Sequence, residues 1–313
     1  MQKMLSPVVL FVYNRPDHTK KLLESINRLI EAPLTKLFIF SDQAKNISEQ
    51  DSVDMVRKLI GNFIQNQSNF AEVELRCATQ NMGLANSIIN GVTEIINKYG
   101  NVIVLEDDLI VSNDFLSYMN EALNFYEGNS NIWAISGYSF PMKATKDYQY
   151  DIFMCGRACS WGWATWKDRW NTVDWDVSDY NQFKHNIFKR LAFSRWGKDL
   201  PEMLDANFYN EIHSWAIRWC YEAHKQKKMT VYPVKSRIKN CGTDGSGTNF
   251  TSVKTCFDTD LIDEDVRCQF VNCEASEQIR YEFSKKYAAG LELLKRRLRW
   301  FLIRTGLIKA HVK

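Results

Sequence analysis

The sequence predicts an open α/β fold in which a mostly parallel sheet is flanked by helices. Strand and helix patterns alternate through the first half of the 313 residues. Residues 101–105 form an apolar run, typical of a strand that is buried on both faces. This run ends abruptly in Glu106, Asp107 and Asp108, as strands do at the ligand-binding edge of an open sheet. Such alternation favours right-handed crossovers, which place helices on both faces of the sheet.

The elements of the first half follow from hydrophobic periodicity and helix caps. The expected strands cover residues 8–13, 36–41, 73–77, the run from 101, and 132–136. The expected helices cover residues 17–30, 53–63, 85–99 and 113–126. Asp17 and Ser112 would cap the first and last of these helices, and Gly100 would end the third.

Beyond about residue 140 the pattern becomes irregular. Residues 155–166 place three tryptophans around a glycine, a helix carries Trp215, a strand is expected near residues 230–234, and residues 240–248 form a glycine-rich loop. The tryptophan-rich stretch has two interpretations, a platform that stacks on a sugar or a tightly packed structural turn. The glycines allow a ligand to approach the backbone closely, but a flexible surface loop would look the same.

The three carboxylates after residue 105 are the strongest functional signal. Burying an unpaired carboxylate costs several kcal/mol, so three adjacent ones must reach water, cations or a ligand that carries cations. Hard oxygen ligands suit Mg²⁺ or Mn²⁺, and Mg²⁺ usually takes one or two carboxylates together with substrate phosphates. The sequence therefore predicts a site for a divalent cation and a nucleotide diphosphate, with a solvated acidic turn as the alternative.

Composition argues against a nucleic-acid-binding, a membrane-spanning or a disulfide-bonded protein. A net charge of +3 is too mild to indicate a nucleic-acid partner. No apolar run approaches the length that spans a bilayer. The eight cysteines lack paired zinc-ligand spacing and no signal peptide precedes them, so reduced thiols in a cytoplasmic protein are expected.

Taken in order, the motifs resemble those of GT-A-type nucleotide-sugar glycosyltransferases, and among them the N-acetylglucosaminyltransferase I-like family with its bacterial relatives. The resemblance spans roughly residues 7–250 and is carried by short motifs at residues 12–16, 41–42, 81–84, 104–109, 133–137, 161–163, 214–215 and 240–245. Each motif is weak alone, but the acidic block is moderately specific and the ordered set is strong.

The resemblance implies a role for particular residues. Asp108 would bind Mn²⁺ or Mg²⁺ directly, and Glu106 and Asp107 would lie beside the ribose and the donor sugar. The remaining nucleotide contacts would come from Asn14 or Arg15, Asp42, Asn81, Gly83 and Leu84. The acceptor would lie against Trp161, Gly162, Trp163 and Trp215.

Family members of this kind invert the anomeric carbon, which requires a base opposite the leaving group. The family aspartate that precedes the tryptophan of the second-half helix corresponds here to His213. This departure leaves three candidates for the base: His213, Glu211 two residues earlier, and Asp244 in the glycine-rich loop.

The C-terminal segment 291–304 has helical spacing, with Leu291, Leu294, Leu298, Phe301 and Leu302 on one face and basic residues over much of the rest. Such a basic amphipathic helix suits the surface of an anionic membrane. A helix that docks on the catalytic domain or on a second subunit is the alternative.

The sequence thus predicts a GT-A (Rossmann-like) domain with a nucleotide-sugar-binding half at 1–140, an irregular acceptor-binding half at 141–275 and a basic helical segment at 276–313. The expected activity is transfer of a sugar, preferably from a UDP-sugar, to a bacterial surface glycan or lipid-linked oligosaccharide. The enzyme would work in the cytoplasm, at the inner face of the membrane if the C-terminal helix binds lipid.

The alternatives are a sugar nucleotidyltransferase, whose usual glycine-rich phosphate loop is missing near Asn14, and a non-catalytic sugar or nucleotide-sugar binder.

Overall fold

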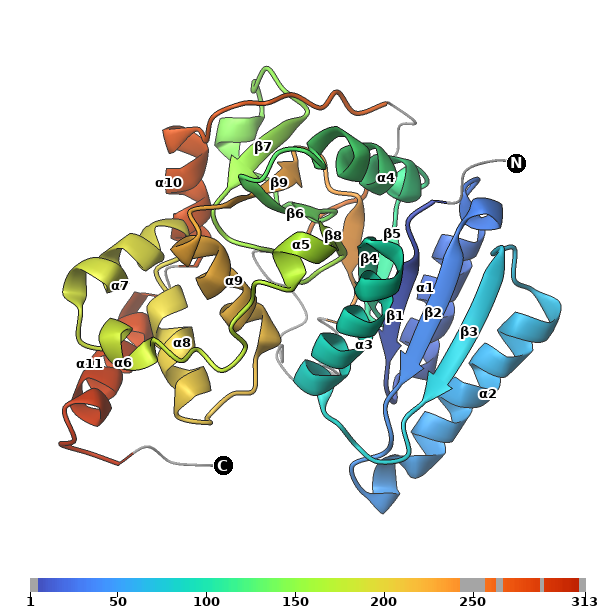
Figure 1. Ribbon diagram of the computed structural model, residues 1–313, viewed down its shortest axis with the longest axis horizontal. Helices are drawn as coiled ribbons and strands as arrows, with labels where there is room; N and C mark the ends of the chain where they lie inside the picture. Colours follow the sequence, from blue (N-terminus) through green and yellow to red (C-terminus); the bar gives the residue numbers. More distant parts are fainter. Residues whose placement is uncertain (1–4, 243–256, 263–266, 288–289, 310–313) are drawn as a thin grey trace.

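The computed structural model describes residues 5–242, 257–262, 267–287 and 290–309. Eight strands form one mixed sheet in the order β3-β2-β1-β4-β8-β6-β9-β7, with helices on both faces (Figure 1). The strands are β1 (Val8–Val12), β2 (Lys36–Ser41), β3 (Glu72–Cys77), β4 (Asn101–Glu106), β6 (Ile132–Ser136), β7 (Ile152–Cys155), β8 (Trp163–Trp166) and β9 (Met229–Pro233). Only β7 and β8 run against the others, so the predicted mostly parallel α/β sheet is confirmed.

The helices that flank this sheet follow the predicted alternation in the first half. They are α1 (Pro16–Asn27), α2 (Gln50–Asn66), α3 (Leu84–Tyr99) and α4 (Phe115–Tyr126). The second half adds α5 (Lys167–Trp170), α6 (Tyr180–Phe183), α7 (Ile187–Phe193), α8 (Leu200–Phe208), α9 (Trp215–Lys225), α10 (Glu277–Lys286) and α11 (Gly290–Arg304). Short 3₁₀ turns are η1 (Ala32–Leu34), η2 (Ile47–Glu49), η3 (Lys143–Thr145) and η4 (Ser194–Trp196).

Two predicted helix starts are wrong by one turn or less. The helix after β1 begins at Pro16, because a proline needs no hydrogen-bond partner for its nitrogen in the first turn, and Asp17 lies within that turn. The helix after the acidic block begins at Phe115 with Asp114 as its N-cap, and the Ser112 hydroxyl donates to Asp114 Oδ1 at 2.5 Å. Gly100 ends α3 with a φ of 87°, as predicted.

The central strand β1 is buried on both faces because helices cover each side of it. Val8 and Leu10 belong to a core cluster with Leu22 of α1. Val9 lies on the opposite face in a second cluster, with Ile88 of α3. Because the carboxyl ends of β1, β2, β3 and β4 lie at one edge of the sheet, the loops after these strands meet there.

The tryptophan-rich stretch contains an unexpected central strand. β8 (Trp163–Trp166) lies between β4 and β6 and pairs antiparallel with both. A smaller two-stranded sheet joins β5 (Leu109–Val111) to β10 (Ile238–Asn240), so the chain after the acidic block pairs with a segment far along the sequence.

The C-terminal helix α11 packs on α8 at the end of the molecule opposite β3 and α2 (Figure 1). Among the described residues, none of the helices is long and apolar enough to cross a membrane. No disulfide joins the cysteines that the structure describes.

Candidate active site

The acidic block lies at the carboxyl end of β4, between the parallel strand β1 and the antiparallel strand β8. Glu106 is the last residue of the strand and pairs in register with Phe11. Asp107 and Asp108 form the turn into β5, so their side chains leave the sheet at the edge where the loops converge. Asp107 is 3% exposed as a residue, which makes its carboxylate one of the most buried charges of the protein.

Arg15 binds two of these carboxylates at once. The residue precedes α1, and its guanidinium lies 3.0 Å from Asp107 Oδ1 and 3.3 Å from Asp108 Oδ2. The backbone N–H of Tyr13 donates to the other Asp107 oxygen at 3.2 Å. The loop after β1 therefore neutralises part of the acidic block through the Arg15 side chain.

The pKa values of Glu106 and Asp107 are both raised, so the acidic block keeps excess negative charge despite Arg15. Burial raises the pKa of Asp107 to about 6, although Arg15 acts to lower it. Burial, followed by the charges of Asp108 and Asp107, raises the pKa of Glu106 well above its usual range. Burial alone would lower the pKa of Arg15, but Asp107 and Asp108 outweigh it and the pKa rises. A further cation would therefore be stabilised beside this block.

Two segments that the sequence did not associate with the block complete its surroundings. The N–H of Cys241 donates to the backbone oxygen of Asp108 at 2.7 Å, because β10 pairs with β5 directly after the acidic turn. His18 Nε2 lies 3.2 Å from the Cys241 oxygen, and its charge lowers the pKa of Asp107. At Gly242 a Cβ atom would lie 2.5 Å from Asp108 Oδ2, so only glycine allows this close approach.

The donor chemistry of the block fits a divalent cation that also binds a substrate. Carboxylate oxygens are the ligands that Mg²⁺ and Mn²⁺ prefer, and Asp108 lies at the turn with its side chain 18% exposed. Within the part of the chain that the structure describes, no group of three or more His, Cys, Asp or Glu residues is arranged to hold a metal by itself. Mg²⁺ commonly binds through one or two carboxylates and completes its shell with phosphates and water.

Asp42 organises the loop after β3 instead of presenting a free carboxylate. Its two oxygens accept the N–H groups of Met82 and Gly83, both at 2.9 Å, and the side-chain amide of Asn81 at 3.3 Å. Gly83 has a φ of 72°, which favours glycine at this position. The three predicted nucleotide contacts at Asp42, Asn81 and Gly83 are thus joined in one hydrogen-bonded loop, and Leu84 follows as the first residue of α3.

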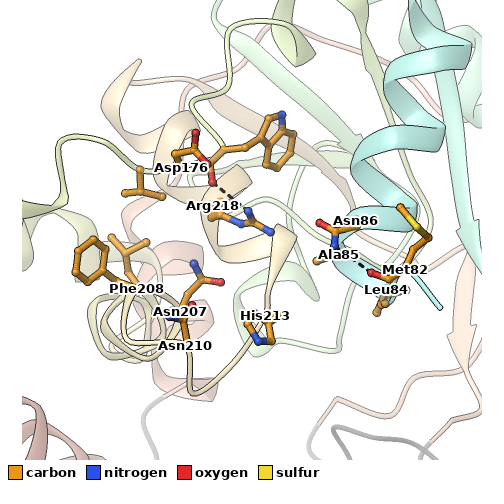
Figure 2. Close-up of a pocket in the computed structure, with 14 residues that line it drawn as sticks. Met82, Leu84, Ala85, Asn86, Asp176, Asn207, Phe208, Asn210, His213 and Arg218 are labelled. Carbon is orange, nitrogen blue, oxygen red and sulfur yellow. Dashed lines mark hydrogen bonds between the residues drawn. The ribbon is translucent and has the colours of Figure 1, made fainter. Parts of the chain in front are cut away.

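A cavity of about 560 Å³ lies between this loop and the second half of the chain (Figure 2). One wall is formed by residues 82–86 at the start of α3. The opposite wall is formed by residues 175–177, the end of α8, the α8–α9 loop and Arg218 of α9. Figure 2 shows His213 and Arg218 on the side that faces Leu84 and Asn86. Arg218 donates to the backbone oxygens of Ser214 and Trp175 at 3.1 and 3.0 Å.

The three candidates for the base differ in their placement. His213 is exposed and lines the cavity, and the next residue, Ser214, caps α9. Glu211 forms a two-pronged ion pair with Arg299 of α11, which occupies both of its carboxylate oxygens. Asp244 lies outside the described residues. The left-handed φ of 59° at Asn210, a residue type that tolerates it, shapes the loop that presents His213.

Two of the predicted acceptor residues are buried in the core. Trp163 is 1% exposed and stacks on Trp215, itself 3% exposed, with ring centroids 5.1 Å apart. Their faces are covered because Trp163 belongs to β8 in the middle of the sheet. A sugar-stacking platform therefore does not fit these two rings. Gly162 is buried with a φ of 61°, whereas Trp161 is half-buried and packs edge-on against Tyr138.

Sequence reasoning missed four residues that line the site: His18, Trp175, Phe208 and Arg218. His18 could have been suspected, since it lies in the first turn of the helix that follows Arg15. The other three carry no local signal, because the cavity brings together segments from different parts of the second half. Asn14 lies in the loop after β1 as predicted, 3.5 Å from Glu49 Oε1 through its side-chain amide.

Comparison with known proteins gives limited similarity. No protein-family model and no curated protein matches the chain. Among solved structures, it is similar to the mannosyltransferase PcManGT from Pyrobaculum calidifontis in complex with GDP-Man and Mn²⁺, with 11% identity, a TM-score of 0.36, and 53% of this chain and 46% of that chain covered. It is also similar to S. aureus TarS, with 13% identity, a TM-score of 0.33, and coverage of 46% and 24%. The similarity thus spans less than half of either solved chain. TM-scores of this size support no conclusion about function, which is therefore argued from the residues of this chain.

Proposed function

We propose that this protein is a metal-dependent glycosyltransferase that moves a sugar from a nucleotide diphosphate donor to an acceptor hydroxyl, with a UDP-sugar as the favoured donor. The observation that carries the proposal is the acidic block at the carboxyl end of β4, whose charge Arg15 and His18 offset in part. It lies at the sheet edge where open α/β folds bind nucleotides. The loop held by Asp42 borders the same edge.

In this proposal Asp108 holds Mn²⁺ or Mg²⁺, and the donor diphosphate supplies further oxygen ligands. The bound cation would neutralise charge that develops on the departing nucleotide. Glu106 and Asp107 would lie beside the ribose and the donor sugar, with Asn14, Asn81, Gly83 and Leu84 along the nucleotide. Asp42 and Arg15 position these groups, the first through the loop at residues 81–83 and the second through the two aspartates.

The reaction forms a bond between the acceptor oxygen and the anomeric carbon and breaks the bond from that carbon to the diphosphate oxygen. The hydroxyl proton passes to a base, and the bonding pair leaves with the nucleotide. We assign the base to His213, because it is exposed in the cavity while Glu211 is bound to Arg299. An imidazole titrates near neutral pH and suits this role. Attack opposite the leaving group would invert the anomeric carbon.

The acceptor would enter the cavity between α3 and the α8–α9 loop. The aromatic surfaces available there are Trp175 and Phe208, and Phe208 is 38% exposed. Rings of this kind stack on sugar faces, and the side chains of Asn207 and Asn210 offer hydrogen bonds to hydroxyls. A glycan or a lipid-linked glycan is the acceptor class that we propose.

A non-catalytic nucleotide-sugar binder is the second candidate, favoured by the histidine where the resembling family has aspartate and by the engagement of Glu211 with Arg299. Donor hydrolysis distinguishes the two functions. An active enzyme should release nucleotide from its preferred donor slowly even without acceptor, whereas a binder should release none above the background rate.

The first test is a thermal-shift panel of UDP-, GDP-, CDP- and dTDP-sugars with and without Mn²⁺. A ligand at about 100 times its Kd stabilises the native state by about 2.7 kcal/mol, which gives a measurable rise in Tm. We expect one nucleotide to raise the Tm only when the metal is present. If no nucleotide shifts the Tm at millimolar concentration, the acidic block is not a donor site and the proposal is wrong.

A further inference from the structure

The C-terminal helix α11 uses one face to dock on the protein and leaves the other uncovered. The docked face carries Trp300 and Ile303, which are 2% and 6% exposed. Trp300 stacks on Tyr209 with ring centroids 5.6 Å apart and an interplanar angle of 22°. The docking alternative for this helix is therefore realised, but through residues outside the apolar set that the sequence pattern marks.

Ion pairs fix the rotation of α11 on α8. Arg299 pairs with Glu211, and Arg304 pairs with Asp205, which is fully buried. Arg297 lies 3.3 Å from Glu202 Oε1 through its Nε atom. The pair of Arg304 with Asp205 is buried, with side chains 10% and 0% exposed, so turning the opposite face of the helix inward would break a buried charge pair at a cost of about 3–5 kcal/mol.

The uncovered face carries an apolar stripe. Leu294, Leu298 and Phe301 follow the i, i+4, i+7 spacing of one helix face and are 61%, 61% and 53% exposed. Single exposed apolar residues are ordinary, but three in line on a helix with a fixed orientation form a contiguous patch, which marks an interaction site.

A second exposed apolar group lies on α7, which also packs on α8. Ile187, Phe188 and Leu191 are 64%, 80% and 60% exposed. Arg190 of this helix binds the same Asp205 carboxylate as Arg304 of α11, at 2.8 Å. Figure 1 places α7, α8 and α11 together at the end of the molecule away from α2. Both apolar groups are thus held at one end through a shared buried charge network.

Basic residues beside the apolar groups of α7 and α11 indicate a partner with negative charge. Of the five basic residues of α11, Arg297, Arg299 and Arg304 pair with carboxylates of the protein. The other two, Lys295 and Arg296, are exposed, and Lys295 directly follows Leu294. On α7, exposed Lys189 directly follows Phe188. A second copy docked through the same surface would bring like charges together, whereas an anionic surface would complement them. Apolar side chains flanked by lysine and arginine are typical of helices that lie in the interface of an anionic membrane.

We propose that the end formed by α7 and α11 docks on an anionic phospholipid bilayer. Leu294, Leu298 and Phe301 would enter the headgroup region together with Ile187, Phe188 and Leu191. This inference stands apart from the proposed glycosyl transfer, although a lipid-linked acceptor would be encountered at such a surface.

The experiment is co-sedimentation of the full chain with vesicles of phosphatidylcholine, with and without phosphatidylglycerol. The wild-type protein should bind the anionic vesicles, and salt should weaken this binding. The triple variant Leu294→Ser/Leu298→Ser/Phe301→Ser should partition at least about tenfold more weakly, because less apolar surface is buried. Ile187→Ser/Phe188→Ser should act in the same direction. Lys189→Gln on α7 should weaken partitioning roughly fivefold, the effect of one basic residue near an anionic surface.

The matched control is Ile47→Ser/Met55→Ser, which removes residues that are 89% and 58% exposed near α2. This control should bind vesicles as the wild type does. Wild-type partitioning of the α11 triple variant would overturn the proposal, and wild-type partitioning of the α7 variant would remove α7 from the surface. A dimer that the α11 variant converts to a monomer in sedimentation velocity without vesicles would identify a second copy as the partner instead. Donor binding should be unchanged in all variants, so failure here would leave the proposed function untouched.

Discussion

At the scale of single residues, Arg15 is the counter-charge of the acidic block. It binds both Asp107 and Asp108, and Asp107 keeps a pKa of about 6 even with this partner. For an aspartate whose folded pKa is raised, the stabilising effect is fully present below the unfolded pKa and is lost as the pH rises through the folded value. At neutral pH the block therefore costs stability, and Arg15 limits that cost.

Replacing Arg15 tests this role. Arg15→Met should lower the free energy of unfolding by about 1–3 kcal/mol at neutral pH, because two carboxylates lose their partner in a buried site. Much of the loss should be regained at about pH 5, where Asp107, whose pKa burial raises to about 6, binds a proton. Urea unfolding at the two pH values measures the difference. An equal loss at both would mean that Arg15 acts through packing and not through charge.

Asp108 is the residue on which the metal assignment depends. Asp108→Asn keeps the shape of the side chain and removes its charge, so the fold should survive while the affinity for Mn²⁺ with a nucleotide diphosphate falls at least about tenfold. Isothermal titration of the nucleotide with and without Mn²⁺ measures this affinity. Asp51→Asn, an exposed carboxylate on α2, is the matched control and should bind as the wild type does.

His213 and Glu211 are separated by their surroundings, and the structure gives them different expected phenotypes. His213→Ala should reduce donor hydrolysis by about 10²–10⁴-fold, the usual contribution of a general base, with donor affinity unchanged. Glu211→Gln should instead lower the Tm, because it breaks the pair with Arg299. If Glu211→Gln abolishes hydrolysis while His213→Ala retains it, the roles that we assign are reversed.

At the scale of elements, a buried charge network joins the four helices α6, α7, α8 and α11. Asp205 of α8 is fully buried, and its carboxylate binds Tyr180, Arg190 of α7 and Arg304 of α11. α7 and α8 also share a large apolar cluster through Phe193 and Leu204, whereas the described buried residues that pack with Trp300 of α11 are Ala206 and Ile303. The carboxylate of Asp205 thus links both α7 and α11 to α8.

Removing the Asp205 carboxylate should strongly lower the free energy of unfolding. Asp205→Ala leaves two arginines without their partner in a buried site, and we expect a loss of about 3–5 kcal/mol in the free energy of unfolding. Glu277→Ala is the matched control, because Glu277 is 67% exposed and its pairs with Arg195 and Arg280 at the surface should contribute about 1 kcal/mol or less each. Chemical denaturation of both variants measures the two effects. Equal small losses would show that the network does not hold these helices.

At the scale of the whole molecule, one sheet crosses the boundary near residue 140 between the two halves that the sequence predicts within a single domain. β6 lies within residues 1–140, but both of its neighbours, β8 and β9, lie beyond them. β4 also loses its partner β8 if the chain is cut there. The two halves therefore share one sheet and the apolar clusters on both of its faces.

A fragment of residues 1–140 tests this dependence. It would leave β6 unpaired and expose one edge of β4, so we expect no cooperative unfolding transition and a tendency to aggregate. Circular dichroism during thermal denaturation of the fragment and of the full chain measures whether each unfolds cooperatively. A cooperative transition in the fragment would show that the first half is a domain that folds independently.

The sequence by itself determined the alternating strands and helices, the buried strand that ends in carboxylates, and the glycine that ends α3. These features depend on local periodicity and on conformations that glycine adopts readily, which the order of residues specifies directly. The tertiary structure decided that Trp163 is a core residue in a central strand, that Arg15 and Gly242 meet Asp108, and that α11 docks through Trp300. These contacts join segments far apart in the chain. The physical reason is that the burial and the ion pairing of a side chain depend on the distant residues that pack against it, and a local sequence pattern does not specify those residues.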